Sequence, residues 1–526
     1  MQGTKVLDCT LRDGGYYTCW DFDRQLVKDY TQVVQRLPID VVEIGYRAPP
    51  CLDRYYGEYY YLPLRTIERL HGWLNGSVDL AVMLNAKDCR IDDVVSLLEG
   101  CERWVKLVRM AVAPDGIQHG IGLAREIKRA GYQVTLNIMH MHMILEDQTI
   151  LRTLEQEAEN IDYVYLVDSY GSCLPQQVRT LIAEVKRRLP QKIGFHGHDN
   201  ISLAFANTLA AVEAGADIVD GTMLGIGRGA GNTRTELLTA YLGKQSEQSV
   251  DYSDCSELLD KFEKLREQYR WGSSVPYIVS GLERLPQKDV MEWIGKRRYS
   301  TTTIVRILQG SCQKYQISGN CYPLIHDKKN LLKGDAGTAV IIGGGENAVR
   351  HADAILEYAN AHRAIIIYSS LKNVGRYTNE STPQLVCLAG QESQKLRGVE
   401  QPVEHISMFV VSTLPRIEQE IPDAWQERVV AVEPFGRPLG VGAEKTLDDI
   451  SPLGLSLGVV RDLGVKKVLL AGFDGYPGNS MDEIVLAEEV QSCIDLFRNM
   501  NPAITINSIT PTLYKIPQSS VYASFE

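Results

Sequence analysis

Residues 192–198 read KIGFHGH, a short β-rich run that carries two histidines at its C-terminal end. An amphipathic stretch, PQQVRTLIAEVKRRL at residues 175–189, comes before it. This alternation of β-rich run, loop and amphipathic stretch recurs along the first half of the chain. The eight β-rich runs are residues 5–10, 40–46, 79–85, 104–112, 133–139, 163–168, 192–198 and 217–224. Nearly continuous apolar runs that are separated by helices indicate a parallel sheet with both faces covered.

Eight strand–helix units in a span of about 250 residues predict a (β/α)8 TIM barrel. A doubly wound open sheet is the competing architecture. Polar residues decide between the two, because they gather at the predicted C-terminal ends of the strands, which on a barrel all face one mouth. These residues are Asp13, Glu43, Asn85, Arg109, Asn137, Asp168, His196, His198 and the segment 225–232. The mouth of the barrel is therefore the predicted reaction site.

The rest of the chain divides into two further regions, so that the barrel is assigned to residues 1–250. Residues 251–333 are mostly helical and rich in Arg, Lys and Tyr, and they form either a cap over the barrel mouth or a packing bridge. Residues 334–526 begin with a strand, a glycine turn and a helix start in GTAVIIGGGEN (337–347), and further strands are expected within residues 364–370, 383–389, 407–413, 428–434 and 466–476. This pattern predicts a Rossmann-like α/β domain. Its glycines do not complete a dinucleotide-binding motif, so no cofactor is assigned to it.

Composition narrows the class of protein. The chain has 526 residues, of which 44% are hydrophobic and 23% charged, as in a folded protein of more than one domain. Its net charge of −11 is not gathered into blocks and argues against a nucleic-acid partner. No window approaches the length of a membrane span, and the N-terminus lacks a signal-peptide pattern. The 11 cysteines form no CxxC pair, which is typical of reduced thiols in a cytoplasmic enzyme.

The pentapeptide HGHDN at 196–200 is the strongest chemical signal. Residues i and i+2 of a strand point to the same side, so His196 and His198 can reach one point in space, and Gly197 leaves room between them. Two imidazoles and one carboxylate make a nitrogen and oxygen site for a divalent transition metal. The alternative is that both histidines bond neighbouring carbonyls and bind no metal.

A second histidine pair has the same spacing. His140 and His142 follow the fifth predicted strand, and spacing alone does not choose between the pairs. Only the pair at 196 and 198 has glycine between its members and Asp-Asn behind it. His140 and His142 are therefore candidates for bases or substrate contacts, with surface histidines at a helix start as the alternative.

The glycine-rich segment GIGRGAGN at 225–232 follows the eighth strand. Its glycines permit a close approach of the backbone, and the helix that begins nearby offers N–H groups to an anion. Phosphate and carboxylate sites recur after the last strands of such barrels. Gly227 and Gly229 are therefore candidate substrate contacts.

Three separated motifs resemble those of one family. LRDGG at 11–15, HGHDN at 196–200 and GIGRGAGN at 225–232 together are similar to the motifs of the DRE-TIM metallolyases, the HMGL-like family. The likeness extends over residues 1–245. FHGHDN and the GAGNT segment look closest to the 4-hydroxy-2-oxovalerate aldolase branch.

The resemblance implies roles for individual residues. Asp13, His196 and His198 are expected to ligate a divalent metal, and Asn232 either ligates it too or braces the loop. Arg12 is expected to bind the oxygen of an enolate, so that metal and guanidinium together hold a 2-oxo acid. Manganese is the favoured ion, with cobalt, zinc and magnesium as alternatives. Three further residues are expected to line this site, namely Asp168 as a tuning residue and Glu43 and Arg109 as substrate contacts.

The chain departs from the family at one point. The aldolase branch has a histidine shortly after its Arg-Asp-Gly, and the synthases have a glutamate, whereas this chain has Gly15, Tyr16 and Tyr17. The family's general base is thus not at its expected place. Tyr16 or Tyr17 could move protons through a water, or His140 or His142 could take the role.

These observations predict a divalent-metal-dependent aldolase, a carbon–carbon lyase that acts on a 2-oxo acid, with pyruvate and an aldehyde as substrates. The second domain looks similar to Rossmann-like domains of glycan-locus proteins, which suggests an acceptor from sugar or glycoconjugate metabolism. One alternative is an acyl-CoA-dependent Claisen-type synthase, and another is a catalytically weakened docking scaffold. The chain is expected to form a homo-oligomer, and a partner enzyme is a further expectation left open. Binding to nucleic acid or to a membrane is not expected.

Overall fold

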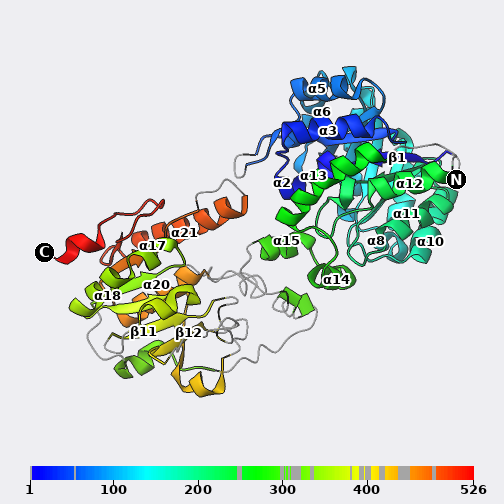
Figure 1. The fold of residues 1–526 in the computed structure, drawn as a ribbon. Helices are drawn as coiled ribbons and strands as arrows, with labels where there is room; N and C mark the ends of the chain where they lie inside the picture. The colour runs from blue at the N-terminus through cyan, green and yellow to red at the C-terminus, as the bar shows by residue number, and fades with distance from the viewer. Residues whose placement is uncertain are drawn as a thin grey trace. The chain divides into compact units, whose positions relative to one another are not determined.

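A computed structural model gives the structure of the chain. It describes residues 3–51, 55–245, 252–295, 301, 304–305, 308–309, 321–331, 337–378, 382–389, 392, 396, 404–413, 421–435, 451–476 and 481–525. The chain forms two compact units, Met1–Glu292 and Trp293–Glu526, which are drawn in Figure 1 and are described separately below. Within the described ranges, no helix combines the length and apolar character that crossing a membrane requires.

The first unit is a closed barrel of eight parallel strands. The strands are β1 (Lys5–Asp8), β2 (Val41–Tyr46), β3 (Asp79–Asn85), β4 (Val105–Val112), β5 (Gln133–Ile138), β6 (Tyr163–Asp168), β7 (Lys192–Gly197) and β8 (Ile218–Gly221). They pair in sequence order, and β8 closes the barrel on β1 with Lys5 opposite Ile218. The predicted TIM barrel is confirmed, and each of the eight predicted runs contains one strand.

Helices surround the barrel and connect its strands. The longer ones are α3 (Arg24–Val34), α5 (Leu64–Leu74), α6 (Asp93–Leu98), α7 (Ile117–Arg129), α9 (Thr149–Glu157), α10 (Pro175–Arg188), α11 (Ala204–Glu213) and α12 (Thr235–Gln245). Helix α3 shows why they form there. The Asp23 side chain accepts a hydrogen bond from the Leu26 backbone N–H at 2.9 Å and caps its first turn. Leu26, Val27 and Tyr30 then lie on one face and are buried.

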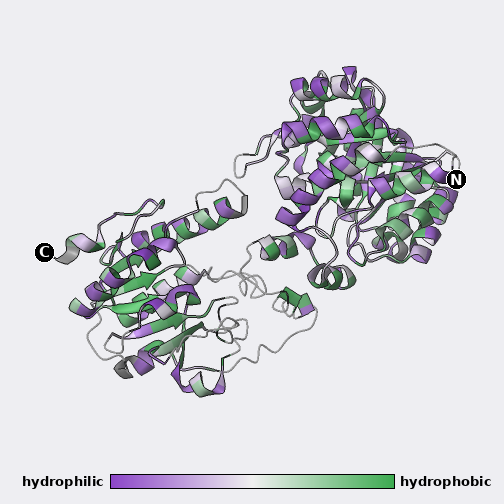
Figure 2. Cartoon of the chain, viewed as in Figure 1, coloured by the Kyte–Doolittle hydropathy of each residue, from purple (hydrophilic) through white to green (hydrophobic). Residues whose placement is uncertain are grey.

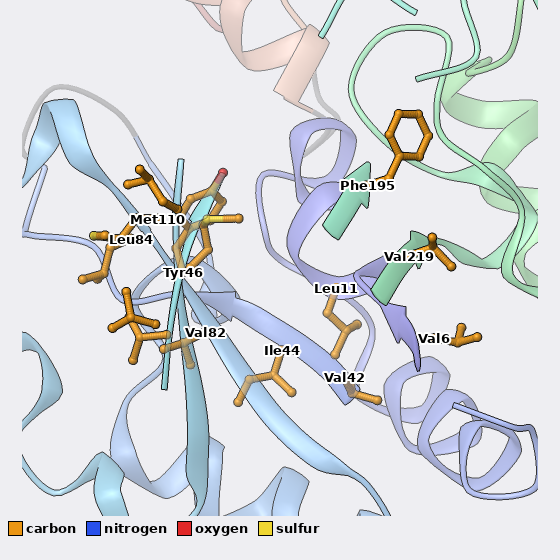
Figure 3. Packing of buried hydrophobic residues seen from close by; sticks show 14 of the residues in the cluster. Val6, Leu11, Val42, Ile44, Tyr46, Val82, Leu84, Met110, Phe195 and Val219 are labelled. Atoms are coloured by element: carbon orange, nitrogen blue, oxygen red, sulfur yellow. The ribbon is translucent and has the colours of Figure 1, made fainter. Parts of the chain in front are cut away.

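Alternation along the strands separates two kinds of core. Val42 and Ile44 of β2 belong to the large apolar cluster between sheet and helices, part of which Figure 3 shows. The opposite faces of the strands meet inside the barrel in a smaller cluster formed by Leu7, Cys9, Val41, Ala81, Leu107, Tyr163, Tyr165 and Ile218. Two residues further along, the inward positions of four strands are polar, namely Glu43, Arg109, His196 and Asp220. A layer of charged groups thus lies above an apolar floor, towards the C-terminal ends of the strands.

Three helices follow the barrel: α13 (Ser253–Tyr269), α14 (Val275–Leu282) and α15 (Gln287–Gly295), and the first unit ends within α15. The Tyr277 hydroxyl of α14 lies 3.2 Å from that of Tyr17. The Gln287 side chain of α15 donates to Asn200 Oδ1 at 2.7 Å. Both contacts are to segments that follow the C-terminal ends of strands, and the choice between a cap and a packing bridge stays a prediction. The predicted boundary at 333/334 lies outside the described residues, and the division of the chain at that point stays a prediction.

The second unit is built on a seven-stranded parallel sheet. Its strands are β9 (Thr338–Ile342), β10 (Ile365–Tyr368), β11 (Gln384–Cys387), β12 (Met408–Ser412), β13 (Val429–Val432), β14 (Lys467–Ala471) and β15 (Thr505–Ser508), in the order β13-β12-β11-β10-β9-β14-β15. The strand β15 was not among the predicted ones. The longer helices of the unit are α18 (Ala352–Ala361), α20 (Pro452–Leu463) and α21 (Met481–Met500), and a short α17 (Glu346–Arg350) follows β9.

Apolar side chains cover both faces of this sheet. Leu455 of α20 and Phe497 of α21 pack on one face, and Ile355 and Tyr358 of α18 pack on the other. Figure 2 shows the strands mostly in the green of hydrophobic residues and purple residues on the helices. The predicted α/β class is confirmed, and the Rossmann-like assignment of this unit stays a prediction.

Candidate active site

Asp13, His196 and His198 converge at the mouth of the barrel. Asp13 ends a short helix, α1 (Thr10–Asp13), that follows β1 directly, while His196 lies in β7 and His198 just beyond it. All three side chains are buried, and one ligand atom from each lies within 4.8 Å of the others. His196 Nε2 is 3.6 Å from Asp13 Oδ2. The structure therefore brings together the three residues that the sequence proposed as metal ligands.

Both imidazoles are oriented through their Nδ1 atoms. His196 Nδ1 lies 2.9 Å from Asp220 Oδ2, and His198 Nδ1 lies 2.9 Å from the carbonyl oxygen of Asp168. A partner on Nδ1 fixes the ring and leaves Nε2 as the ligand atom, which is the usual arrangement around protein-bound metals. Burial and the neighbouring charges of His196 and Arg228 lower the pKa of His198 to about 3, which keeps it neutral and able to ligate.

Electrostatics prepares Asp13 for the same role. Burial opposes its ionisation, but the Arg12 guanidinium and both imidazoles outweigh burial and hold the pKa of Asp13 well below its usual range. The Asn232 amide nitrogen donates to Asp13 Oδ2, and Asn232 Oδ1 is buried without a hydrogen-bond partner among the described residues. An unpartnered buried oxygen beside two imidazole nitrogens and a carboxylate fits a divalent transition metal.

A chain of buried ion pairs supports this cluster from below. Arg12 Nη1 bonds Asp13, and Arg12 Nε bonds Glu43 Oε2 at 2.7 Å. The same Glu43 oxygen accepts from Arg109 Nη1 at 3.0 Å, and Arg109 Nη2 bonds Asp220 Oδ2 at 2.5 Å. Asp220 holds His196, so one network runs from the first ligand to the second. Glu43 and Arg109 have no exposed surface, which gives them supporting positions.

The Asp168 carboxylate is bound by its own loop. Its carboxylate accepts hydrogen bonds from the backbone N–H groups of Ser172 at 3.3 Å and Cys173 at 3.1 Å. Burial raises the pKa of Asp168, and these bonds oppose the shift only in part. The residue thus fixes its own loop, while its carbonyl oxygen holds His198.

The two tyrosines after Arg-Asp-Gly-Gly are both engaged. The Tyr17 hydroxyl donates to the Gly229 carbonyl at 2.6 Å and contacts the Tyr277 hydroxyl, and burial raises the pKa of Tyr17 well above its usual value. The Tyr16 hydroxyl lies 3.2 Å from that of Tyr46, which is buried on β2. Tyr17 therefore ties the strand-eight loop to α14, while the half-buried Tyr16 lines the mouth.

The rings of His140 and His142 both lie beside that of Tyr170. The His140 ring packs against Tyr170 at 4.7 Å between centroids, and its Nδ1 is buried without a partner among the described residues. Burial, with the charges of Arg228 and His142, lowers the pKa of His140 to about 4. His142 opens α8 (His142–Glu146), and burial and the charge of Arg284 lower its pKa. Of these two histidines, His140 is the one whose pKa is lowered by the charge of Arg228, which also lowers the pKa of His198.

Gly227 and Gly229 act as spacers in the strand-eight loop. A Cβ on Gly227 would lie 2.4 Å from Asn232 Nδ2, and one on Gly229 would lie 1.8 Å from Gln287 Oε1. Gly229 also has φ +68°, a conformation that suits glycine. These glycines allow Asn232 and Gln287 to approach the loop closely.

Comparisons with known proteins agree with this geometry. The model of the HMGL-like family matches residues 4–261. The chain is 34% identical over 250 residues to the 4-hydroxy-2-oxovalerate aldolase of Chloroflexus aurantiacus, an alignment that covers 46% of this chain and 70% of that protein. The chain belongs to the HMGL-like family.

Two further relatives extend the likeness of this HMGL-like barrel. The 4-hydroxy-2-oxovalerate aldolase of Thermomicrobium roseum is 34% identical over 246 residues, which covers 46% of this chain and 67% of that protein. A crystal structure of the N-terminal domain of a candidate aldolase from Bacteroides vulgatus is 39% identical and has a TM-score of 0.54. The alignment covers 57% of this chain and 99% of the Bacteroides vulgatus domain. The predicted family and the predicted enzyme class, a metal-dependent carbon–carbon lyase of aldolase type, are confirmed.

Sequence reasoning missed several residues of the HMGL-like site. Asp220 lies two residues after Ile218 on the inward face of β8, so strict alternation along DIVDG could have indicated it. Arg228 stands inside the quoted glycine segment and is the only charged residue there. Tyr277 and Gln287 come from the helical region, where no local signal marks them.

Proposed function

We propose that this protein is a divalent-metal-dependent aldolase. It joins pyruvate to an aldehyde and, in the reverse direction, cleaves the product into these two compounds. The observation that carries the proposal is the convergence of Asp13, His196 and His198 with Arg12 directly beside them. Relatives named 4-hydroxy-2-oxovalerate aldolase at 34% identity support the same reaction class.

Asp13, His196 and His198 would hold the cation, and Asn232 Oδ1 offers a fourth ligand atom. When bound there, a divalent cation supplies a Lewis acid that polarises the keto group of a 2-oxo acid. Among the candidate ions we propose manganese, because a mixed set of carboxylate, amide and imidazole ligands suits it. Asp220 and the Asp168 carbonyl keep the two rings in place.

Arg12 is assigned to the oxygen that becomes negative when the carbon–carbon bond breaks. Its Nε and Nη1 are bound to Glu43 and Asp13, which fixes the plane of the guanidinium. Its Nη2 has no hydrogen-bond partner among the described residues. A donor that is fixed before the reaction stabilises developing charge without a cost of reorganisation.

We assign proton transfer to His140. Tyr17 is an unsuitable base, because burial raises its pKa and its hydroxyl already donates to Gly229. His140 instead is neutral at ordinary pH and has an unpartnered buried Nδ1. Tyr16, whose hydroxyl is shared with Tyr46, and His142 remain the weaker candidates.

Glu43 and Arg109 are proposed as positioning residues and not as direct substrate contacts, since both are fully buried in the ion-pair network. We propose the same for Asp168, whose carboxylate holds its own loop. Gly227 and Gly229 are proposed to shape the substrate-binding loop.

The test is the exchange of pyruvate methyl protons with deuterated water, which proton NMR monitors. The enzyme is supplied either with Mn²⁺ at low concentration or with Mg²⁺. Enolate formation predicts exchange by the wild type and none by Asp13→Asn. Asp29→Asn, a change on the outer helix α3, is the matched control and should exchange normally. A wild type that binds metal but does not exchange would contradict the proposal.

Two measurements address the other functional classes. Release of free coenzyme A from acetyl-CoA and a 2-oxo acid would favour the Claisen-type synthase. Absence of any bound divalent ion after titration would favour the docking scaffold. A homo-oligomer, a partner enzyme, a cytoplasmic location and an acceptor from glycoconjugate metabolism stay predictions.

A further inference from the structure

Residues 225–232 of the loop that follows β8 carry one charged side chain, Arg228, on a tightly held backbone. On one side of it, Gly229 donates its N–H to Met291 Sδ at 3.1 Å and accepts the Tyr17 hydroxyl at 2.6 Å. On the other side, Gly227 packs so closely on Asn232 that a Cβ there would collide with the amide. The Arg228 backbone is therefore fixed relative to the metal-site residues, and its side chain has a defined origin.

The Arg228 guanidinium has no polar partner in the part of the chain that the structure describes. Its Nε is buried and makes no hydrogen bond, and its carbon Cζ lies 5.9 Å from the centre of the Tyr16 ring. Its charge also contributes to the lowered pKa values of His140 and His198, one member of each histidine pair. All three neighbours are neutral rings, so none of them balances the charge.

A count of the charges in the buried network shows that the positive charge of Arg228 has no negative counterpart. The connected side chains comprise two cations and three anions, namely Arg12, Arg109, Asp13, Glu43 and Asp220. A divalent cation converts their single negative charge into a single positive one, and the carboxylate of a 2-oxo acid neutralises that. Arg228 then adds a positive charge for which metal, network and donor substrate supply no partner. Asp168 does not supply it, because its carboxylate is bound to backbone N–H groups.

An unmatched, half-buried guanidinium that faces a reaction site is poised for an anion, because its fork of donors matches carboxylate and phosphate oxygens. We propose that Arg228 binds an anionic group on the aldehyde substrate, so that this enzyme takes an aldehyde carrying a carboxylate or a phosphate rather than a simple neutral aldehyde. The inference rests on the proposed aldolase function and names the class of its second substrate.

Two pairs of aldehydes of matched length test the inference. Butanal and succinic semialdehyde differ by a terminal carboxylate, and glyceraldehyde and its 3-phosphate differ by a phosphate. The metal-loaded wild type with pyruvate should give a lower KM for the charged member of at least one pair, and the pair that responds identifies the anion. Arg228→Gln should raise the KM of that charged aldehyde about 10- to 100-fold and leave the KM of its neutral counterpart within about twofold.

Two further variants separate charge from packing. Arg228→Lys keeps the charge without the fork and should recover part of the lost selectivity. Arg234→Gln removes a positive charge six residues further along the same loop, where Arg234 is exposed and paired with Glu236 at 2.7 Å, and should retain full selectivity. Equal selectivity losses in Arg228→Gln and Arg234→Gln would overturn a specific site.

A binding measurement complements the kinetics. Calorimetric titration with the unreactive alcohols 4-hydroxybutyrate and glycerol 3-phosphate, against 1-butanol and glycerol, should show preference for a charged ligand in the wild type and its loss in Arg228→Gln. The inference is overturned if no charged ligand is preferred, or if Arg228→Gln raises the KM of pyruvate instead. Failure of pyruvate proton exchange in the wild type refutes the proposed function separately, and the titration then still decides whether Arg228 binds anions.

Discussion

Asp220 holds His196 by a contact of 2.9 Å between Oδ2 and Nδ1, and the same oxygen accepts from Arg109. The carboxylate therefore orients His196, which is one of the three proposed ligands. We expect Asp220→Asn to weaken metal affinity about 10- to 100-fold, which is usual for partners of ligating histidines. Equilibrium dialysis against Mn²⁺ measures the effect. An unchanged affinity in a folded variant would show that His196 is held by other contacts.

The two histidines after β5 differ in their surroundings, and their variants should differ in activity. His140→Gln should slow exchange of pyruvate methyl protons about 10²- to 10⁴-fold, the usual contribution of a general base. His142→Gln is the matched control, because its ring lies beside the same Tyr170 and it is expected to lose far less. Proton NMR of exchange at saturating pyruvate measures both, and the reverse order would assign the base to His142.

The low pKa of His140 also predicts a pH dependence of stability. Its pKa is about 4 in the folded protein, below the ordinary value of 6.5. Between these values the unfolded chain binds a proton that the folded protein does not, so the free energy of unfolding should fall as pH drops from 6.5 towards 4. Denaturant titrations at pH 7, 5.5 and 4.5 measure this. The fall should be smaller in His140→Gln, and parallel curves would contradict the low pKa.

Replacement of glycine by alanine should have opposite effects at Gly227 and at Gly72. Gly227→Ala should lower metal affinity, because the new methyl group would lie 2.4 Å from Asn232 Nδ2 and must displace the amide. Gly72 lies within α5, where a Cβ would meet nothing within 4 Å. Gly72→Ala should therefore stabilise the protein by about 0.5–1 kcal/mol and leave metal binding unchanged. Thermal unfolding with and without Mn²⁺ distinguishes the two.

Periodicity predicted the barrel well, because each strand of a covered parallel sheet is apolar along its own length. The strand β15 was not predicted, because three of its four residues, Thr505, Asn507 and Ser508, are polar and give it little apolar signal. It is recognisable only through its pairing with β14. Local sequence is thus sufficient for strands that are buried on both faces and insufficient for a polar strand at the edge of a sheet.

The site was predictable where two residues belong to one strand and less so where they meet across the barrel. Alternation brings His196 and His198 to one point, and Gly197 between them with Asp-Asn behind them distinguishes this pair from His140 and His142. The pairing of Arg12 with Glu43, and the burial of Arg109 beneath them, depend on closure of the barrel. The contact between the hydroxyls of Tyr17 and Tyr277 joins residues 260 positions apart, and no sequence motif predicts it.

The contacts of Gly229 with Tyr17 and Met291 have a consequence for protein synthesis. The loop that carries Asn232 is held between a residue near the start of the chain and one almost at the end of the first unit. A ribosome that has released only the eight strands therefore exposes a barrel whose reaction centre is still unbraced. Catalytic competence should arise late in translation, once α15 has emerged, and a gene truncated after the barrel should yield a poorly active fragment.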